Sequence, residues 1–366
     1  MPVPRAPRHH APVLRRGPGE LQFGTDPRWA VRVVGLAPEE ERWLQTLGAS
    51  ARHAPLDRPT PPVERRESLL RLLDDAGVLV GRRRRRRVGP APGGGEAELA
   101  VLDALRADGA GHRVLAARAR AVVGVVGLGR IGASLATTLA TSGIGTLTLH
   151  DPAPVLASDV GLGGFRLRDV GASREVALRR SVEEVAPGIA TCTGAGPDVV
   201  VVVEHRVADP VRLRELVGDG VPHLSVVVRE ADVLVGPYVR PGLDPCVRCL
   251  DLHRQDADPC WPQVSHQLRE AGGAEHEEAV LASVAAAVAA GQVLTAIDGS
   301  MPRTATACIE IAAPDAVPRL RGTSRHPACG CGDLTSAPPD GTPLAGGVPS
   351  VAATGARRSG DGTVVG

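Results

Sequence analysis

Lysine and asparagine are both absent from this chain of 366 residues. All 42 basic residues are therefore arginine, which excludes a P-loop lysine, a Schiff-base lysine and any lysine-based phosphate clamp. The lack of asparagine excludes an N-glycosylation sequon. Because 41 acidic residues leave a formal charge of only +1, the chain as a whole has no electrostatic attraction to polyanions.

Aromatic residues are scarce at 2%, whereas apolar residues make up 43%. The core must therefore consist of Val, Leu, Ile and Ala, and a base-stacking surface for nucleic acid has almost no material. No apolar run reaches the roughly 18 residues of a membrane-spanning helix, and the N-terminus lacks the hydrophobic stretch of a signal peptide. The seven cysteines are an odd number. These features predict a cytoplasmic protein, without a membrane partner, whose thiols are free or bound to metal.

Composition divides the chain into five segments. Residues 1–18 are expected to form a flexible tail and residues 336–366 a disordered one. Residues 19–80 are predicted to form a small winged-helix-like module, and residues 96–335 are predicted to form one α/β domain. Residues 81–95 contain six consecutive arginines beside Pro and Gly. This is typical of a solvated linker or of a patch that binds nucleic acid or an acidic partner, and the linker is favoured.

The expected module contains two helical patterns. Residues 38–47 begin with Pro and three Glu, and residues 64–73 form an amphipathic helix. We expect Leu69, Leu70, Leu72 and Leu73 to face the core.

A glycine-rich loop follows the apolar segment 121–126 and contains Gly127, Gly129 and Gly132. A helical pattern and a second strand ending at Asp151 come next, which is the strand–turn–helix–strand context of a nucleotide-binding fingerprint. Such glycines let phosphate approach the backbone at a helix N-terminus, and the acid accepts ribose hydroxyls. The alternative is an ordinary βαβ turn in which the glycines serve only tight packing.

Further strands and one long helix complete the expected domain. The segments 198–203 and 223–228 are nearly continuous β-branched runs, as in parallel strands that are covered on both faces. An alanine-rich helix is expected at 277–298. Together these patterns predict a Rossmann-like α/β fold with a mostly parallel sheet.

Four cysteines form two close pairs, Cys246 with Cys249 and Cys329 with Cys331. Four thiolates can bind a tetrahedral Zn²⁺ at about 2.3 Å, and such a closed site is structural. The alternatives are a redox CxxC pair or four unrelated thiols. A redox pair should open a helix directly after a strand, whereas this CxxC follows a loop rich in Pro and Gly.

The glycine loop, the segments GIGTLTLHD and DVGASR, and the two cysteine pairs occur in an order that resembles the ThiF/HesA/MoeB family, over about residues 110–335. The resemblance implies a dimeric Rossmann-like scaffold with a structural zinc that uses MgATP to adenylate the C-terminus of a small ubiquitin-like protein. It also implies nucleotide contacts at Gly127, Gly129, Gly132 and Asp151.

The string GPYVRPGLDPCVRCLDLHR and the later segments DPCWP and HPACGC are similar to a divergent branch of this family. That branch comprises the ThiF-like partner proteins of azoline-forming cyclodehydratases in peptide natural-product clusters. The resemblance implies that residues 19–80 bind the leader of a precursor peptide, and we expect the Leu69–Leu73 face to provide the floor of the binding groove beside an exposed strand edge. It further implies a homodimer and a YcaO-type cyclodehydratase as partner.

Several positions depart from the pattern of the active family. The replaced residues are Leu162 or Gly163 for an arginine finger, Asp159 for an asparagine, Arg174 for a phosphate-binding lysine, and Glu204 or His205 for a magnesium-binding aspartate. Arg174 keeps a geometry suited to phosphate, and Glu204 keeps an oxygen ligand for a metal. Loss of the finger and the asparagine nevertheless argues against efficient adenylation, which depends on positioning and charge neutralisation.

The sequence therefore predicts a zinc-containing scaffold that binds a leader peptide and has a degraded adenylation site. An active ATP-dependent adenylyltransferase of a carrier protein or peptide C-terminus is the alternative. A third hypothesis is an NAD(P)-dependent oxidoreductase, since such enzymes have the same glycine fingerprint. Such an enzyme does not, however, need the two cysteine pairs. No catalytic residue is assigned.

Overall fold

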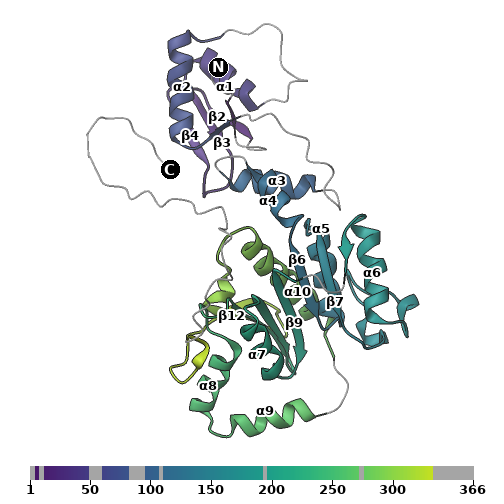
Figure 1. Cartoon of the computed structure of the whole chain (residues 1–366). Coiled ribbons are helices and arrows are strands. Elements are labelled where there is room, and N and C mark those ends of the chain that lie inside the picture. The colour runs from purple at the N-terminus through teal and green to yellow at the C-terminus, as the bar shows by residue number, and fades with distance from the viewer. Residues whose placement is uncertain are drawn as a thin grey trace. The chain divides into compact units, whose positions relative to one another are not determined.

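The computed structural model describes residues 5–7, 12–48, 60–81, 95–106, 110–192, 196–271 and 276–332. The expected tail at 336–366 and residues 82–94 of the expected linker lie outside this part of the chain. The chain forms two compact units, one reaching Arg113 and the other beginning at Val114 (Figure 1). Each unit has its own hydrophobic core.

The N-terminal unit combines a small antiparallel sheet with helices. Its elements are β1 (Arg5–Pro7), β2 (Val13–Gly17), β3 (Glu20–Phe23), β4 (Val31–Val33), α1 (Pro38–Gly48), α2 (Val63–Asp75), β5 (Leu79–Gly81) and α3 (Glu96–Leu105). The sheet has the order β2-β3-β4, and β1 pairs separately with β5. Helix α4 (Gly111–Arg118) spans the division between the units.

Two expectations for this unit need correction. The sheet begins at Val13, which pairs with Phe23, so residues 13–17 of the expected flexible tail are part of it. In α2, Leu69 and Leu73 are buried, but Leu72 is 46% exposed. The buried stripe is centred between Leu69 and Leu70, and Leu72 lies about 100° away from that centre around the helix.

The second unit is built on an eight-stranded sheet in the order β13-β12-β11-β10-β9-β6-β7-β8. Its strands are β6 (Val122–Val126), β7 (Thr146–His150), β8 (Ala190–Thr191), β9 (Val199–His205), β10 (His223–Val228), β11 (Asp232–Val239), β12 (Ala307–Ala312) and β13 (Pro318–Gly322). Strands β6 to β10 pair in parallel, and β11, β12 and β13 extend the sheet antiparallel. The predicted mostly parallel α/β fold is confirmed.

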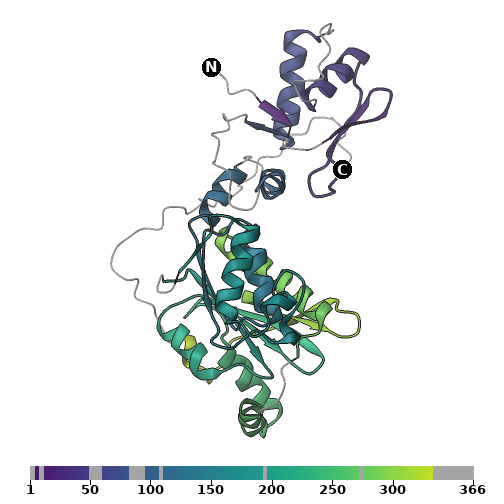
Figure 2. The same cartoon turned by 90° about the vertical axis from the view of Figure 1, so that its right-hand side faces the viewer.

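Helices cover both faces of this sheet, as Figures 1 and 2 show from two sides. The helices that follow β6 in this unit are α5 (Arg130–Thr141), α6 (Arg174–Val185), α7 (Pro210–Gly218), α8 (Val247–Ala257), α9 (Trp261–Glu270) and α10 (Ala279–Ile297). Helix α9 lies beyond the end of the strands, next to α8 (Figure 1). Strand β9 contributes to both faces: Val199, Val201 and Val203 join the core with α5 and α10, and Val200 and Val202 join the core with α7. The continuous valine run is needed because alternate side chains point into different layers.

Helix α10 departs from two expectations. It begins at Ala279, and the Glu278 carboxylate accepts hydrogen bonds from the N–H groups of Val280 and Leu281 at 2.9 and 2.8 Å. By length and composition alone it could cross a membrane, with a mean hydropathy of 2.0, although no such run was expected. It buries residues along its length, including Leu281, Ala289 and Val293, in the core that it shares with α5. This is the behaviour of a core helix.

Candidate nucleotide and metal sites

The glycine loop lies where the order of the strands reverses. Strand β6 pairs with β7 on one side and with β9 on the other, and ligands of open α/β sheets bind at such switch points. Gly127 has a φ of 83°, and a methyl group on it would overlap the carbonyl oxygen of Val203. A methyl group on Gly132 would overlap the carbonyl oxygen of Gly127. The packing of the loop therefore requires both glycines, whichever ligand it holds.

Asp151 is bound to the loop itself. Its carboxylate is buried, and it accepts hydrogen bonds from the backbone N–H of Leu128 at 2.8 Å and from that of Ala153 at 3.0 Å. Both oxygens are thus engaged by protein groups. The residue that the sequence analysis assigned to ribose holds the turn between β6 and α5 in place.

Arg174 lies between two carboxylates. Its Nη1 donates to Asp151 at 2.8 Å, and its Nε and Nη2 donate to Oδ2 of Asp159 at 2.9 and 2.7 Å. Burial acts to lower the pKa of Arg174, but the hydrogen bonds with Asp159 and Asp151 outweigh it and the pKa is raised. The side chain is only 12% exposed. A phosphate could therefore bind to Arg174 only if one carboxylate gave way.

The remaining family positions carry little that would neutralise phosphate charge. Leu162 is 80% exposed and brings no charge. Glu204 accepts from Arg212 Nη1 at 2.8 Å and from the N–H of Asp209 at 3.1 Å, so both oxygens stabilise the start of α7. Burial raises the pKa of Glu204, although these two hydrogen bonds act against the shift.

Glu277 is a further residue at this site, which we did not expect from the sequence. Its Oε2 accepts a hydrogen bond from the N–H of Ile131 in the first turn of α5, and its Oε1 lies 3.0 Å from Nε2 of His205. A methyl group on Gly129 would overlap this carboxylate. The position at the helix N-terminus that favours an anion is thus held by an acid of the chain itself. No local pattern indicates this, because the contact joins residues 146 apart.

The four predicted cysteines come together. Their Sγ–Sγ distances are 4.0 Å between Cys246 and Cys249, 3.7 Å between Cys246 and Cys329, and 3.5 Å between Cys249 and Cys331. All four sulfurs lie within 4.8 Å of one another. A tetrahedral zinc with bonds of about 2.3 Å requires sulfurs about 3.8 Å apart, so the cluster has the size of a zinc site.

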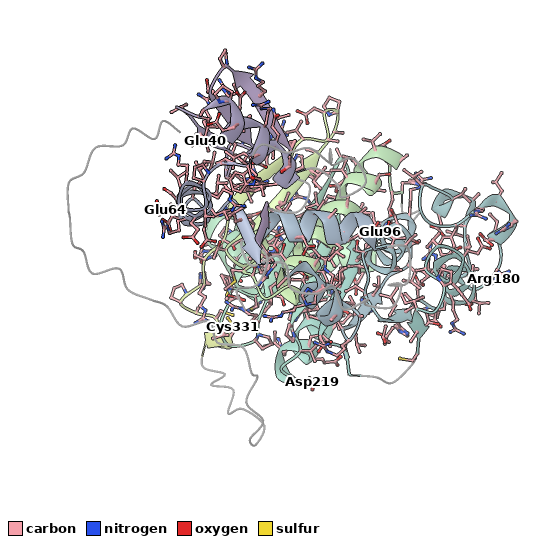
Figure 3. All side chains as sticks on the ribbon, turned by 90° about the horizontal axis from the view of Figure 1, so that it is seen from above. Glu40, Glu64, Glu96, Arg180, Asp219 and Cys331 are labelled. Atoms are coloured by element: carbon pink, nitrogen blue, oxygen red, sulfur yellow. The ribbon has the colours of Figure 1, made fainter. Side chains whose placement is uncertain are left out.

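The pKa values of the thiols differ within the cluster. Burial and neighbouring thiols raise the pKa of Cys246, and burial is the main factor that raises the pKa of Cys331 to about 11. Burial acts in the same direction on Cys249, but the backbone N–H of His326 contributes to lowering its pKa below the usual value. Cys331, labelled in Figure 3, belongs to the short helix η5 (Gly330–Gly332). Because thiolates are the ligands, metal binding must release protons here.

His326 lies beside the cluster and near His253 and Asp256, which together form a second group close enough for a metal. Its Nδ1 accepts a hydrogen bond from the N–H of Ala328 at 3.1 Å, and its Nε2 lies 2.8 Å from the Asp256 carboxylate. This pattern assigns the proton to Nε2, where a metal would need a lone pair. His326 therefore positions the cysteine loop by hydrogen bonding.

A cavity of about 450 Å³ lies between the sheet and helices α8 and α9. Ser225 of β10 is 1% exposed, and its hydroxyl has no hydrogen-bond partner in the described part of the chain. Arg254 lies over the ring of Trp261, 5.0 Å from its centroid, and both line the same cavity. The cavity is large enough for a small ligand or a peptide side chain.

Comparison with known proteins identifies a family and solved structures with a similar fold. The family model described as "ThiF family" matches residues 104–331. E. coli MccB solved with ATP is 19% identical and has a TM-score of 0.65, covering 90% of this chain and 99% of its own. The microcin C7 biosynthetic enzyme MccB in complex with N-formylated MccA is 18% identical, with a TM-score of 0.62 and the same coverage.

PaaA, also solved in crystals, is 16% identical, with a TM-score of 0.62 and coverage of 86% of this chain and 98% of its own. A search of curated proteins by sequence gives no match. Because the family match spans more than half of the chain and agrees with the sheet order, the glycine loop and the cysteine cluster, this chain belongs to the ThiF family.

Proposed function

We propose that this protein serves ribosomal peptide natural-product biosynthesis by binding the leader of a precursor peptide and presenting it to a YcaO-type cyclodehydratase. The observation that carries the proposal is the extent of the similarity to MccB, which covers 90% of this chain and so includes its N-terminal unit. MccB has been solved with MccA, a precursor peptide. An N-terminal peptide-recognition module on a ThiF scaffold accounts for both units.

The leader would add to the free edge of β4. This strand pairs with β3 on one side only, within the described residues, and Val34 directly after it is 59% exposed. An extended peptide gains main-chain hydrogen bonds at such an edge, and apolar side chains nearby give specificity. Leu69 and Leu73 belong to the core of the unit, so they support this surface from within and do not form the floor of the groove.

In this proposal the four cysteines hold one structural zinc. A closed Cys₄ site leaves no coordination position for water or substrate, so the ion would stabilise the fold without taking part in a reaction. A homodimer built on the α/β unit, as the family resemblance implies, would present two leader-binding modules.

Adenylation would be inefficient because the groups that should meet ATP are otherwise engaged. Arg174 is bound to Asp151 and Asp159, Leu162 carries no charge, and Glu277 lies at the N-terminus of α5. Phosphoryl and adenylyl transfer rely on positioned positive charge around the phosphates. An active adenylyltransferase remains the second candidate function, and the observation that favours it is that MccB has been solved with ATP.

Binding of a labelled precursor peptide to the full-length chain tests the proposal. We expect Val34→Glu to weaken leader binding at least about tenfold, because a charge is placed beside the edge that receives the peptide. Val63→Glu is the matched control, since Val63 is also 59% exposed but lies at the start of α2. If both variants bind the precursor peptide as tightly as the unmodified chain does, β4 is not the edge that recognises the leader.

A further inference from the structure

We propose that Glu277 is an internal competitor for the phosphate of a nucleotide at the N-terminus of α5, so that the glycine loop binds nucleotide only when this carboxylate moves away. This inference goes beyond leader-peptide binding, which does not require nucleotide. It makes one residue the determinant of whether the nucleotide that the family resemblance implies for the glycine loop is accepted.

The contacts of Glu277 are those expected of an anion bound at this helix. Its Oε2 accepts from the N–H of Ile131, one of the amide groups that have no partner within the helix. Its Oε1 pairs with His205 at 3.0 Å, and the side chain is 5% exposed. The absence of a Cβ on Gly129 makes room for this carboxylate. A bound phosphate would use the same amide and the same space.

Arg130, the first residue of α5, has one hydrogen-bond donor without a partner in the described part of the chain. Its Nη1 donates to the backbone oxygen of Glu277 at 2.7 Å, and its Nη2 donates to that of Val160 at 2.8 Å. Its Nε is buried and has no hydrogen-bond partner among the described residues. A buried guanidinium donor without an acceptor is unfavourable. The positive charge of Arg130 beside the first turn of α5 favours an anion there.

Charge makes the two occupants mutually exclusive. A carboxylate within about 4 Å of a phosphate opposes it strongly in a partly buried site, since the repulsion is weakly screened there. Nucleotide must therefore displace Glu277 and break its contacts with Ile131 and His205. Glu278 is a natural comparison, because its carboxylate caps α10 through Val280 and Leu281.

The test is ATP binding to full-length protein by calorimetry, with the unmodified chain, Glu277→Gln, Glu277→Ala and Glu278→Gln. We expect Glu277→Ala to bind ATP at least about tenfold more tightly than the unmodified chain, and Glu277→Gln to gain affinity in the same direction. Glu278→Gln should not change ATP affinity. Glu277→Gln preserves the size of the side chain and an acceptor for Ile131, so it remains informative if the alanine variant is unstable.

Equal ATP affinity in all four proteins, whether tight or undetectable, would overturn the role of Glu277. A gain in Glu278→Gln equal to that in Glu277→Gln would also overturn it, because the effect would then be one of general charge. In the unmodified chain, saturating ATP should increase hydrogen exchange at residues 276–278, and unchanged exchange with ATP bound would contradict displacement. Leader-peptide binding, measured on the same proteins, tests the proposed function separately.

Discussion

Replacing Cys329 by serine should release the zinc and destabilise the α/β unit. The Sγ of Cys329 lies 3.7 Å from that of Cys246, and the two residues are 83 positions apart in the chain. Zinc would therefore join the start of α8 to the segment after β13, in addition to the hydrogen bond between His326 and Asp256. Removal of one thiolate opens the tetrahedron and leaves three ligands, which bind zinc far more weakly.

The size of the effect follows from linkage between binding and folding. A metal present at about 100 times its Kd stabilises the folded state by about 2.7 kcal/mol. For a unit of about 150–250 residues, each kcal/mol shifts Tm by about 2–4 °C, so loss of zinc should lower Tm by about 5–11 °C. The raised pKa of Cys331, about 11, means that zinc must displace its proton, so zinc affinity should fall as the pH is lowered.

Metal analysis and thermal unfolding of the full-length protein provide the readouts. The unmodified chain should contain about one zinc per chain, and Cys329→Ser close to none. Cys260→Ser is the matched control, because Cys260 is exposed and outside the cluster. Absence of zinc from the purified protein, or a disulfide between Cys246 and Cys249 under reducing conditions, would refute the reasoning.

Two further predictions concern stability. The pKa of Glu40 is lowered mainly by its hydrogen bond to Arg65, so its contribution is present at neutral pH and is lost as the pH falls through that lowered pKa. Glu40→Gln should therefore cost about 1 kcal/mol at pH 7 and progressively less as the pH falls below the ordinary pKa of glutamate, measured by urea unfolding with tryptophan fluorescence. A cost that does not change with pH would contradict this. Gly132→Ala should destabilise the protein by about 1–3 kcal/mol, because the added methyl group would clash with the carbonyl oxygen of Gly127. Gly291→Ala should stabilise it by about 0.5–1 kcal/mol, because Gly291 lies in α10 with open space around it. Similar shifts of Tm in both variants would contradict the packing described for the loop.

Local sequence patterns predicted much of the α/β unit. The valine run of β9, the glycine loop and each cysteine pair could be recognised from neighbouring residues. This is possible because hydrophobic periodicity, turn geometry and the spacing of ligands within a pair are local properties. The closeness of the four thiols was predicted in the same way, although the pairs lie far apart in the chain. The order of the strands and the antiparallel pairing of β11, β12 and β13 were not predicted, because they depend on contacts between distant segments.

The contents of the glycine-loop site could not be predicted in this way. Whether Arg174 faces a phosphate or pairs with Asp151 and Asp159 depends on how the loop after β7 folds back. The contact of Glu277 with α5 depends on the path of the chain between α9 and α10. Leu72 was misplaced for a simpler reason, since four leucines in five positions do not define a single helical face.

The most direct test of the central claim is ATP–pyrophosphate exchange by the full-length protein in the presence of its precursor peptide. A chain that binds the leader but lacks an effective adenylation site should bind the peptide and give no exchange above the background without enzyme. Robust exchange that depends on the precursor peptide would contradict the claim and identify the protein as an active adenylyltransferase.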